Sequence, residues 1–137
     1  MFKKIAVPTD LAHTDSLQKA LNVAADLSKH YDATITLVGV TVNTPTAAAH
    51  SPEEYAQKLE KFARQQGAQL GVSFECHSVA SADVAIDLEK VLDKAVHAVG
   101  ADLVVMASHV PGFRDHFFRN HTGTLATQTD LSVLIVR

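Results

Sequence analysis

Five short apolar runs recur along the chain, and segments with helical periodicity separate each run from the next. Runs of four to eight apolar residues that end in a polar turn are typical of strands buried on both faces of a parallel sheet. The helical segments would supply the right-handed crossovers that parallel neighbours need. We therefore predict an α/β fold, a doubly wound five-stranded parallel sheet with helices on both faces. The predicted strands are residues 5–7, 33–42, 72–79, 103–106 and 131–136.

The second of the helical segments has the clearest boundaries. Ser51 is placed to cap it, Pro52 suits its first position, and Glu54 would close a capping box. Glycine allows the left-handed turn that stops a helix, so this helix should end near Gly67 or Gly71. The other predicted helices begin at residues 14–16 and 81–83, with a short fourth helix at residues 120–128.

Single residues within two strands carry further predictions. Apolar and polar residues alternate over residues 72–79, so this strand should lie at a sheet edge with one exposed face. Cys76 lies on its apolar face and is predicted to be a buried packing residue. Gly39, inside the second strand, suggests that a backbone or a ligand comes close to it.

Composition and charge argue against several classes of protein. The chain has 137 residues, 47% apolar and 20% charged, which suits a single globular domain over residues 1–137. A net charge of −3 and a pI near 6.2 argue against nucleic-acid binding through phosphate contacts. No apolar run approaches the roughly 20 residues that span a bilayer, and no signal-peptide pattern is present. We expect a cytoplasmic protein without membrane insertion.

The residues after the first and fourth strands are the first candidates for a functional site. In open α/β sheets, ligands bind beyond the carboxyl ends of the strands, where the strand order reverses. For the orders 2-1-3-4-5 and 3-2-1-4-5, we place that point between the first and fourth strands. The residues that follow these two strands are Pro8-Thr9-Asp10 and Ala107-Ser108-His109.

Three segments together resemble the universal stress protein family. They are IAVPTD at residues 5–10, DLVVMASH at residues 102–109 and LSVLIVR at residues 131–137. The resemblance covers the whole chain. It implies a Rossmann-like sheet, of the adenine nucleotide alpha hydrolase type, with the strand order 3-2-1-4-5.

The resemblance also implies that the adenosine half of a nucleotide site is intact. Asp10 would face the adenine and the ribose of the nucleotide. Pro8, Thr9 and Met106 match positions that line the same pocket, and Val40 matches the place where backbone groups contact the adenine edge. The ligand would be ATP or AMP, with no metal expected from the protein alone.

The phosphate half of the site departs from the family pattern. In nucleotide-binding members G-x-x-G-x(9)-G-[ST] follows the fourth strand, and its glycines let backbone amides approach phosphates. Here Ala107 and Val110 stand at the first two glycines. Counting back from the terminal strand puts Arg119 and Asn120 at the last two positions. Strict nine-residue spacing shifts both by one residue, to Asn120 and His121.

Several of these side chains have two interpretations. Ser108 and His109 line either the ligand or a polar turn after a buried strand. Arg119 either binds phosphate through its guanidinium, with Asn120 beside it, or belongs to a solvated helix start. Asp10 either contacts the ligand or caps the first helix through its carboxylate. The spacing of the histidines fits no metal motif, so we expect no metal site.

The resemblance implies a small stress-response or regulatory protein, and the sequence offers no catalytic set of residues. We predict a homodimeric adenine-nucleotide-binding module with an altered phosphate loop, and a transporter-associated regulator is one variant of it. The dimer would form through the strand from Leu131 to Val136, since an apolar strand at a sheet edge must be paired or covered. The alternatives are a dimeric adaptor that binds a protein in place of a nucleotide, and a weak ATPase.

Overall fold

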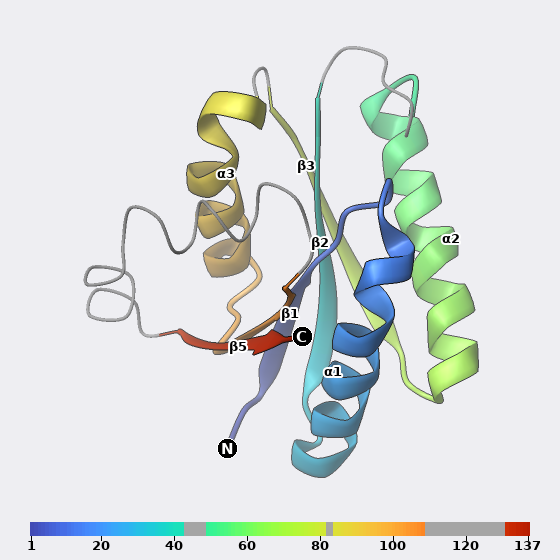
Figure 1. Cartoon of the computed structure of the whole chain (residues 1–137), viewed down its shortest axis with the longest axis vertical. Coiled ribbons are helices and arrows are strands. Elements are labelled where there is room, and N and C mark those ends of the chain that lie inside the picture. The colour runs from blue at the N-terminus through green and yellow to red at the C-terminus, as the bar shows by residue number, and fades with distance from the viewer. Residues whose placement is uncertain (43–48, 82–83, 109–130) are drawn as a thin grey trace.

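A five-stranded parallel sheet forms the centre of the molecule in the computed structural model of the chain (Figure 1). The structure describes residues 1–42, 49–81, 84–108 and 131–137, with residues 84–89 described by their backbone alone. The order β3-β2-β1-β4-β5 confirms the α/β class and the strand order that the family resemblance implied. The strands are β1 (Lys4–Pro8), β2 (Thr34–Val42), β3 (Phe74–Ser81), β4 (Leu103–Ala107) and β5 (Ser132–Val136).

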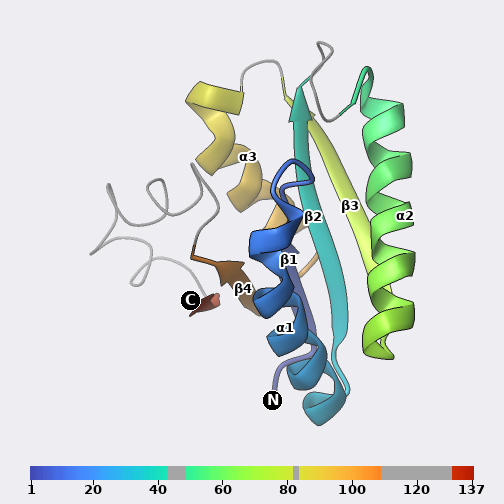
Figure 2. The ribbon, with the colours of Figure 1, turned by 45° about the vertical axis from the view of Figure 1, so that its right-hand side comes forward.

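Helices cover both faces of this sheet. The 3-10 turn η1 (Thr14–Leu17) leads into α1 (Gln18–Tyr31), which lies beside α2 (Pro52–Leu70) on one face (Figure 2). A hydrogen bond of 3.1 Å from Gln18 to Gln66 joins these two helices. On the opposite face α3 (Val84–Ala98) packs on β2 and β3. No helix in the described part of the chain is long and apolar enough to cross a membrane.

The central strands are apolar because both of their faces are covered. Every residue of β4 is buried, and so are all residues of β1 after Lys4. In β3 half-buried and exposed residues largely alternate, which agrees with the predicted edge position. The largest fully buried side chains come from the strands, η1, α1, α2 and α3, and they include Ile5, Leu17, Leu21, Leu37, Leu59, Leu92 and Val105.

The start of β3 differs from the prediction by two residues because the end of α2 takes up the preceding residues. Gly71 adopts a left-handed conformation, with φ of 70°, and its N–H donates to the Gly67 carbonyl at 2.9 Å. The Val72 N–H donates to the same carbonyl at 3.2 Å. Val72 therefore completes the helix cap, and pairing with β2 begins at Phe74.

The start of α2 is close to the prediction. The Ser51 hydroxyl accepts a hydrogen bond of 3.1 Å from the Glu54 N–H, and Pro52 is the first helical residue. The Glu54 carboxylate accepts from the His50 N–H at 3.0 Å, so the return bond of the capping box falls one residue earlier than predicted. This bond, together with the Lys58 ammonium, lowers the pKa of Glu54.

Asp102 fixes the register at the amino ends of the central strands. Its carboxylate accepts hydrogen bonds from the backbone N–H groups of Lys3 and Lys4, at 2.8 and 3.1 Å. Its own N–H donates to the Lys4 carbonyl at 2.9 Å, and its carbonyl accepts from the Ser132 N–H at 3.2 Å. One residue thus aligns β1, β4 and β5, so that their carboxyl ends also meet at a defined level.

Candidate functional site

The carboxyl ends of β1, β2 and β4 bring seven of the predicted site residues together at one end of the sheet. β1 lies between β2 and β4 and is hydrogen-bonded to both. The Thr9 N–H donates to the Val38 carbonyl at 2.8 Å, which continues the ladder between β1 and β2. Counted on in the register of both strand pairs, Asp10 falls level with Val40 and Ser108. The seven residues are Pro8, Thr9, Asp10, Val40, Met106, Ala107 and Ser108.

The other predicted site residues cannot be placed with them. The structure's description stops at Ser108 and resumes at Leu131. The altered phosphate loop and the predicted fourth helix both fall in this interval. His109, Val110, Arg119, Asn120 and His121 therefore lie outside the described residues.

The Asp10 carboxylate is held by its own turn. Oδ1 accepts a hydrogen bond of 2.9 Å from the Ala12 N–H, and Oδ2 lies 2.9 Å from His13 Nδ1. These bonds close a turn ahead of η1, whose N-cap is His13, so Asp10 does not cap the first helix as the alternative prediction had it. Each carboxylate oxygen can accept a further hydrogen bond, for example from a sugar hydroxyl.

Ser108 stands out at this end of the sheet because its hydroxyl is buried without a partner among the described residues. The residue is 6% exposed, and its Oγ makes no hydrogen bond to any described residue. Its backbone N–H donates to the Val136 carbonyl of β5 at 2.9 Å. A buried hydroxyl left unpaired costs about 1–3 kcal/mol, so one without a partner in the described part of the chain is a candidate contact for a ligand.

Tyr55 belongs to this region although the sequence did not single it out. It lies in the first turns of α2, is buried, and donates a long hydrogen bond of 3.4 Å from its hydroxyl to the Thr9 carbonyl. Burial, and then the negative charge of Asp10, raise the pKa of Tyr55, so the phenol is neutral. Gly39 was the available signal, because a glycine inside a strand marks a close approach.

The neighbour that approaches Gly39 is the Tyr55 ring, which corrects the prediction of a backbone or a ligand. A Cβ at position 39 would lie 2.6 Å from the Tyr55 Oη and 2.8 Å from its Cε1. Real Cβ atoms essentially never come so close to another heavy atom. The glycine therefore makes room for an aromatic side chain from α2.

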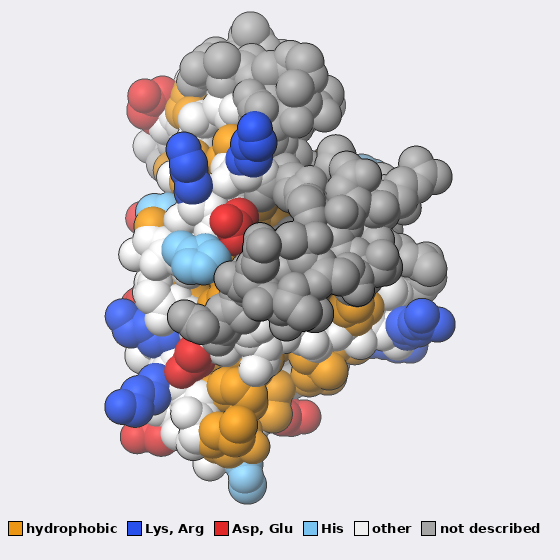
Figure 3. Space-filling model, turned by 90° about the vertical axis from the view of Figure 1, so that its left-hand side faces the viewer, with side chains coloured by type: hydrophobic (Ala, Val, Ile, Leu, Met, Phe, Trp, Pro, Cys, Tyr) orange, Lys and Arg blue, Asp and Glu red, His pale blue; other side chains and the backbone are white. Residues whose placement is uncertain are grey.

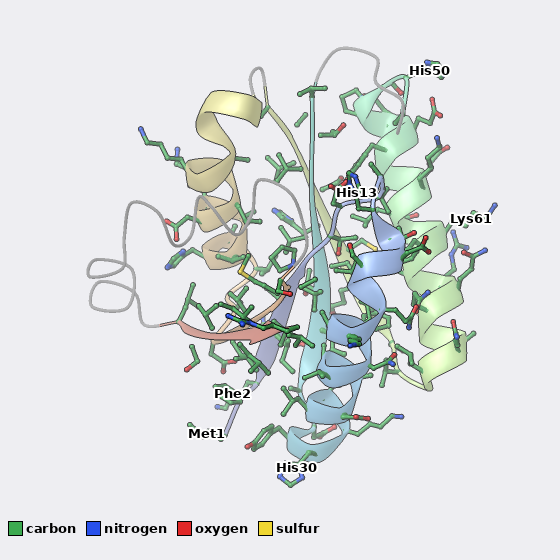
Figure 4. All side chains as sticks on the ribbon, in the orientation of Figure 1. Met1, Phe2, His13, His30, His50 and Lys61 are labelled. Atoms are coloured by element: carbon green, nitrogen blue, oxygen red, sulfur yellow. The ribbon has the colours of Figure 1, made fainter. Side chains whose placement is uncertain are left out.

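Figure 4 shows labelled residues toward both ends of the sheet. His13 and His50 lie toward the end where β1 and β2 finish, whereas Met1, Phe2 and His30 lie at the opposite end. Phe2 stacks edge-to-face on Tyr31, with ring centroids 5.4 Å apart. Among the residues that the structure describes, no three His, Cys, Asp or Glu side chains are grouped so that they could hold a metal ion.

Cys76 lies away from the candidate site, in a shallow hollow between α2 and the edge strand β3. The hollow has a volume of about 250 Å³ and is also lined by Glu60, Ala63, Arg64 and Phe74. Cys76 is half-buried, whereas the prediction had it buried. Burial raises the pKa of its thiol to about 11, which makes it a poor nucleophile at neutral pH.

One comparison with known proteins identifies a family over the whole chain. The profile of the universal stress protein family matches residues 1–137. A search of the curated proteins found no match.

Solved structures are similar to this chain over nearly its full length. A universal stress protein family member from Burkholderia pseudomallei is 19% identical, with a TM-score of 0.66 over 98% of this chain and 95% of that chain. The universal stress protein from Archaeoglobus fulgidus in complex with dAMP is 17% identical, with a TM-score of 0.64 over 98% of both chains. A family protein from Arabidopsis thaliana with AMP bound is 17% identical, with a TM-score of 0.65 over 98% of this chain and 90% of that chain. At these identities the similarity establishes the fold.

Proposed function

The chain belongs to the universal stress protein family, and from this premise we propose that it is a cytoplasmic stress-response or regulatory protein that binds an adenine nucleotide. The observation that carries the proposal is the Ser108 hydroxyl, buried without a described partner and level with Asp10. Two similar structures support it, since one holds AMP and the other dAMP.

The site would act mainly on the adenosine part of the ligand. Asp10 would accept hydrogen bonds from the ribose hydroxyls, and the backbone groups of Val40 would contact the adenine edge. The Ser108 hydroxyl, which has no partner among the described residues, would form a hydrogen bond to the sugar or the α-phosphate. Ala107 and Val110 stand where the family pattern has glycines, so the β- and γ-phosphates would add little affinity. AMP and ATP should therefore bind with similar strength.

Calorimetry with AMP, ADP and ATP tests the proposal. The wild-type protein should release or absorb heat with all three nucleotides, and Asp10→Ala should bind each of them about tenfold more weakly. Asp15→Ala, in the neighbouring turn η1, is the matched control and should bind like the wild type. The absence of binding by any nucleotide would refute the proposal. Mass spectrometry of small molecules that co-purify with the protein gives an independent check.

Experiments with the wild type and its variants also test the two alternative functions, a weak ATPase and an adaptor for a protein partner. Phosphate release from ATP that exceeds the blank and disappears in Asp10→Ala would indicate a weak ATPase. If the wild type binds no nucleotide but the double variant Val110→Gly/Arg119→Gly binds ATP, the altered loop has abolished binding. The protein would then be an adaptor for a protein partner.

We further propose that the protein forms a homodimer through residues 131–136. β5 is an edge of the sheet, and Val133 and Leu134 remain 38% and 37% exposed. Figure 3 shows hydrophobic side chains gathered on the side of the molecule where β5 and the N-terminus lie. An apolar edge strand invites pairing with another strand, and a second copy of β5 offers a matching surface.

Light scattering tests the dimer. The wild type should have the mass of two chains at micromolar concentration, and Leu134→Lys should have the mass of one chain. A monomeric wild type would count against the dimer but not against nucleotide binding. A regulatory protein or a transporter is the further partner that we propose for this module.

A further inference from the structure

We propose that Tyr55 is a positioning residue for the nucleotide site: it holds the Thr9–Asp10 peptide from α2, so that Asp10 is presented to the ligand. The proposal rests on the function proposed for the same site. It names a residue that does not touch the ligand itself and that lies 46 positions from Thr9 in the sequence.

The contact is made at the peptide unit that leads into Asp10. The Tyr55 hydroxyl donates to the Thr9 carbonyl at 3.4 Å, and the Thr9 N–H is bonded to Val38 of β2 at 2.8 Å. A peptide unit is planar, so a bond that holds the Thr9 carbonyl also sets the direction of the Asp10 N–H and the starting point of its side chain. The Asp10 carboxylate is then bonded to the Ala12 N–H at 2.9 Å.

Packing positions the Tyr55 ring independently of the hydrogen bond that its hydroxyl makes. The ring lies against Gly39 so closely that a methyl group there would collide with both Oη and Cε1. The side chain is buried, and its burial with the nearby Asp10 charge keeps the phenol protonated and able to donate. The packing of Tyr55 against Gly39 and its bond to Thr9 therefore link α2 to the carboxyl ends of β1 and β2.

The length of the bond separates a positioning role from a purely structural one. At 3.4 Å it is long for a hydroxyl donor, so its loss should change the stability of the free protein little. Asp10 is the residue that would contact the ligand, so a shift of the Thr9–Asp10 peptide would act directly on nucleotide affinity. The effect of the hydroxyl should therefore be larger on nucleotide affinity than on the melting temperature.

Tyr55→Phe tests the proposal, because it removes the hydroxyl and keeps the ring. The matched control is Tyr31→Phe, since Tyr31 is the other tyrosine of the chain and packs on Phe2 at the opposite end of the sheet. Three quantities are measured on both variants: AMP affinity by calorimetry, the melting temperature, and hydrogen exchange of the Ala12 amide by NMR. The Ala12 amide reports on Asp10 because its N–H donates to the carboxylate.

We expect Tyr55→Phe to bind AMP about three- to tenfold more weakly and to melt within about 3 °C of the wild type. Its Ala12 amide should exchange several times faster, and Tyr31→Phe should match the wild type in affinity and exchange. A Tyr55→Phe protein that binds AMP as tightly as the wild type overturns the proposal and leaves the proposed function standing. If the wild type binds no nucleotide, the proposed function fails, and the Ala12 exchange rate alone decides whether Tyr55 positions Asp10.

Discussion

Removing the Ser108 hydroxyl should change stability and ligand binding in opposite directions. The Oγ is buried in a residue that is 6% exposed, and no described residue offers it a hydrogen bond. Burial of an unpaired hydroxyl costs about 1–3 kcal/mol. Ser108→Ala removes that cost but loses the packing of one oxygen atom, a loss of up to about 1 kcal/mol. The nucleotide-free variant should therefore be as stable as the wild type or up to about 3 kcal/mol more stable.

The same substitution should weaken nucleotide binding. A hydrogen bond from a neutral hydroxyl contributes about 0.5–1.5 kcal/mol, and a bond to a charged phosphate contributes about 1.5–3 kcal/mol. Affinity for AMP should accordingly fall by about tenfold. A substitution that stabilises the free protein and also lowers its affinity for a ligand identifies a side-chain group that serves binding at a cost in stability.

Urea denaturation of ligand-free protein and calorimetry with AMP measure the two effects. Ser78→Ala, on the exposed side of the edge strand β3, is the control and should change neither quantity by a measurable amount. If Ser108→Ala destabilised the free protein by more than about 1 kcal/mol, the hydroxyl would already have a partner there. The reasoning would then be wrong.

Four further predictions concern the framework around the site. Gly39→Ala forces the Tyr55 ring to move and should cost about 1–3 kcal/mol in urea denaturation, much of it recovered in Gly39→Ala/Tyr55→Leu. Asp102→Ala removes the bonds to two backbone N–H groups and should cost about 1–3 kcal/mol by the same assay; an unchanged midpoint would contradict the assigned role. Ser51→Ala should cost about 1 kcal/mol through the lost cap of α2, and Ser51→Gly only a few tenths. Cys76, with a pKa of about 11, should react with iodoacetamide at pH 8 on the order of a hundredfold more slowly than free cysteine. Because the thiol ionises at a lower pH in the unfolded chain than in the folded protein, the free energy of unfolding should fall as pH rises above about 9.

The apolar runs were sufficient to predict the strands that lie inside the sheet. β1 and β4 are covered on both faces, so their sequences must be apolar almost throughout. The boundaries of β3 were less accurate, since Val72 is apolar in the sequence but is used in the cap of α2. A hydrophobic pattern reports burial, and it does not report which backbone partner a residue takes.

The sequence also predicts where a site would lie, because the carboxyl ends of parallel strands meet at the same end of a sheet. Counted on from the pairs of β1 and β4, the predicted site residues Asp10 and Ser108 are level with each other. The strand order itself needed more than the pattern of apolar residues, which left 2-1-3-4-5 and 3-2-1-4-5 open. The family resemblance, with residues 131–137 as one of its segments, selected the order that the structure has.

The sequence by itself therefore determined the alternation of strands and helices, and with it the end of the sheet where a ligand would bind. Only the tertiary structure decided how that end is built. The Tyr55 contact with Thr9 spans 46 positions, and no local pattern encodes it because it depends on where α2 packs on β2. The same holds for Ser108, since a serine after a strand can face water or be buried, and its surroundings in the folded chain leave its hydroxyl buried without a described partner.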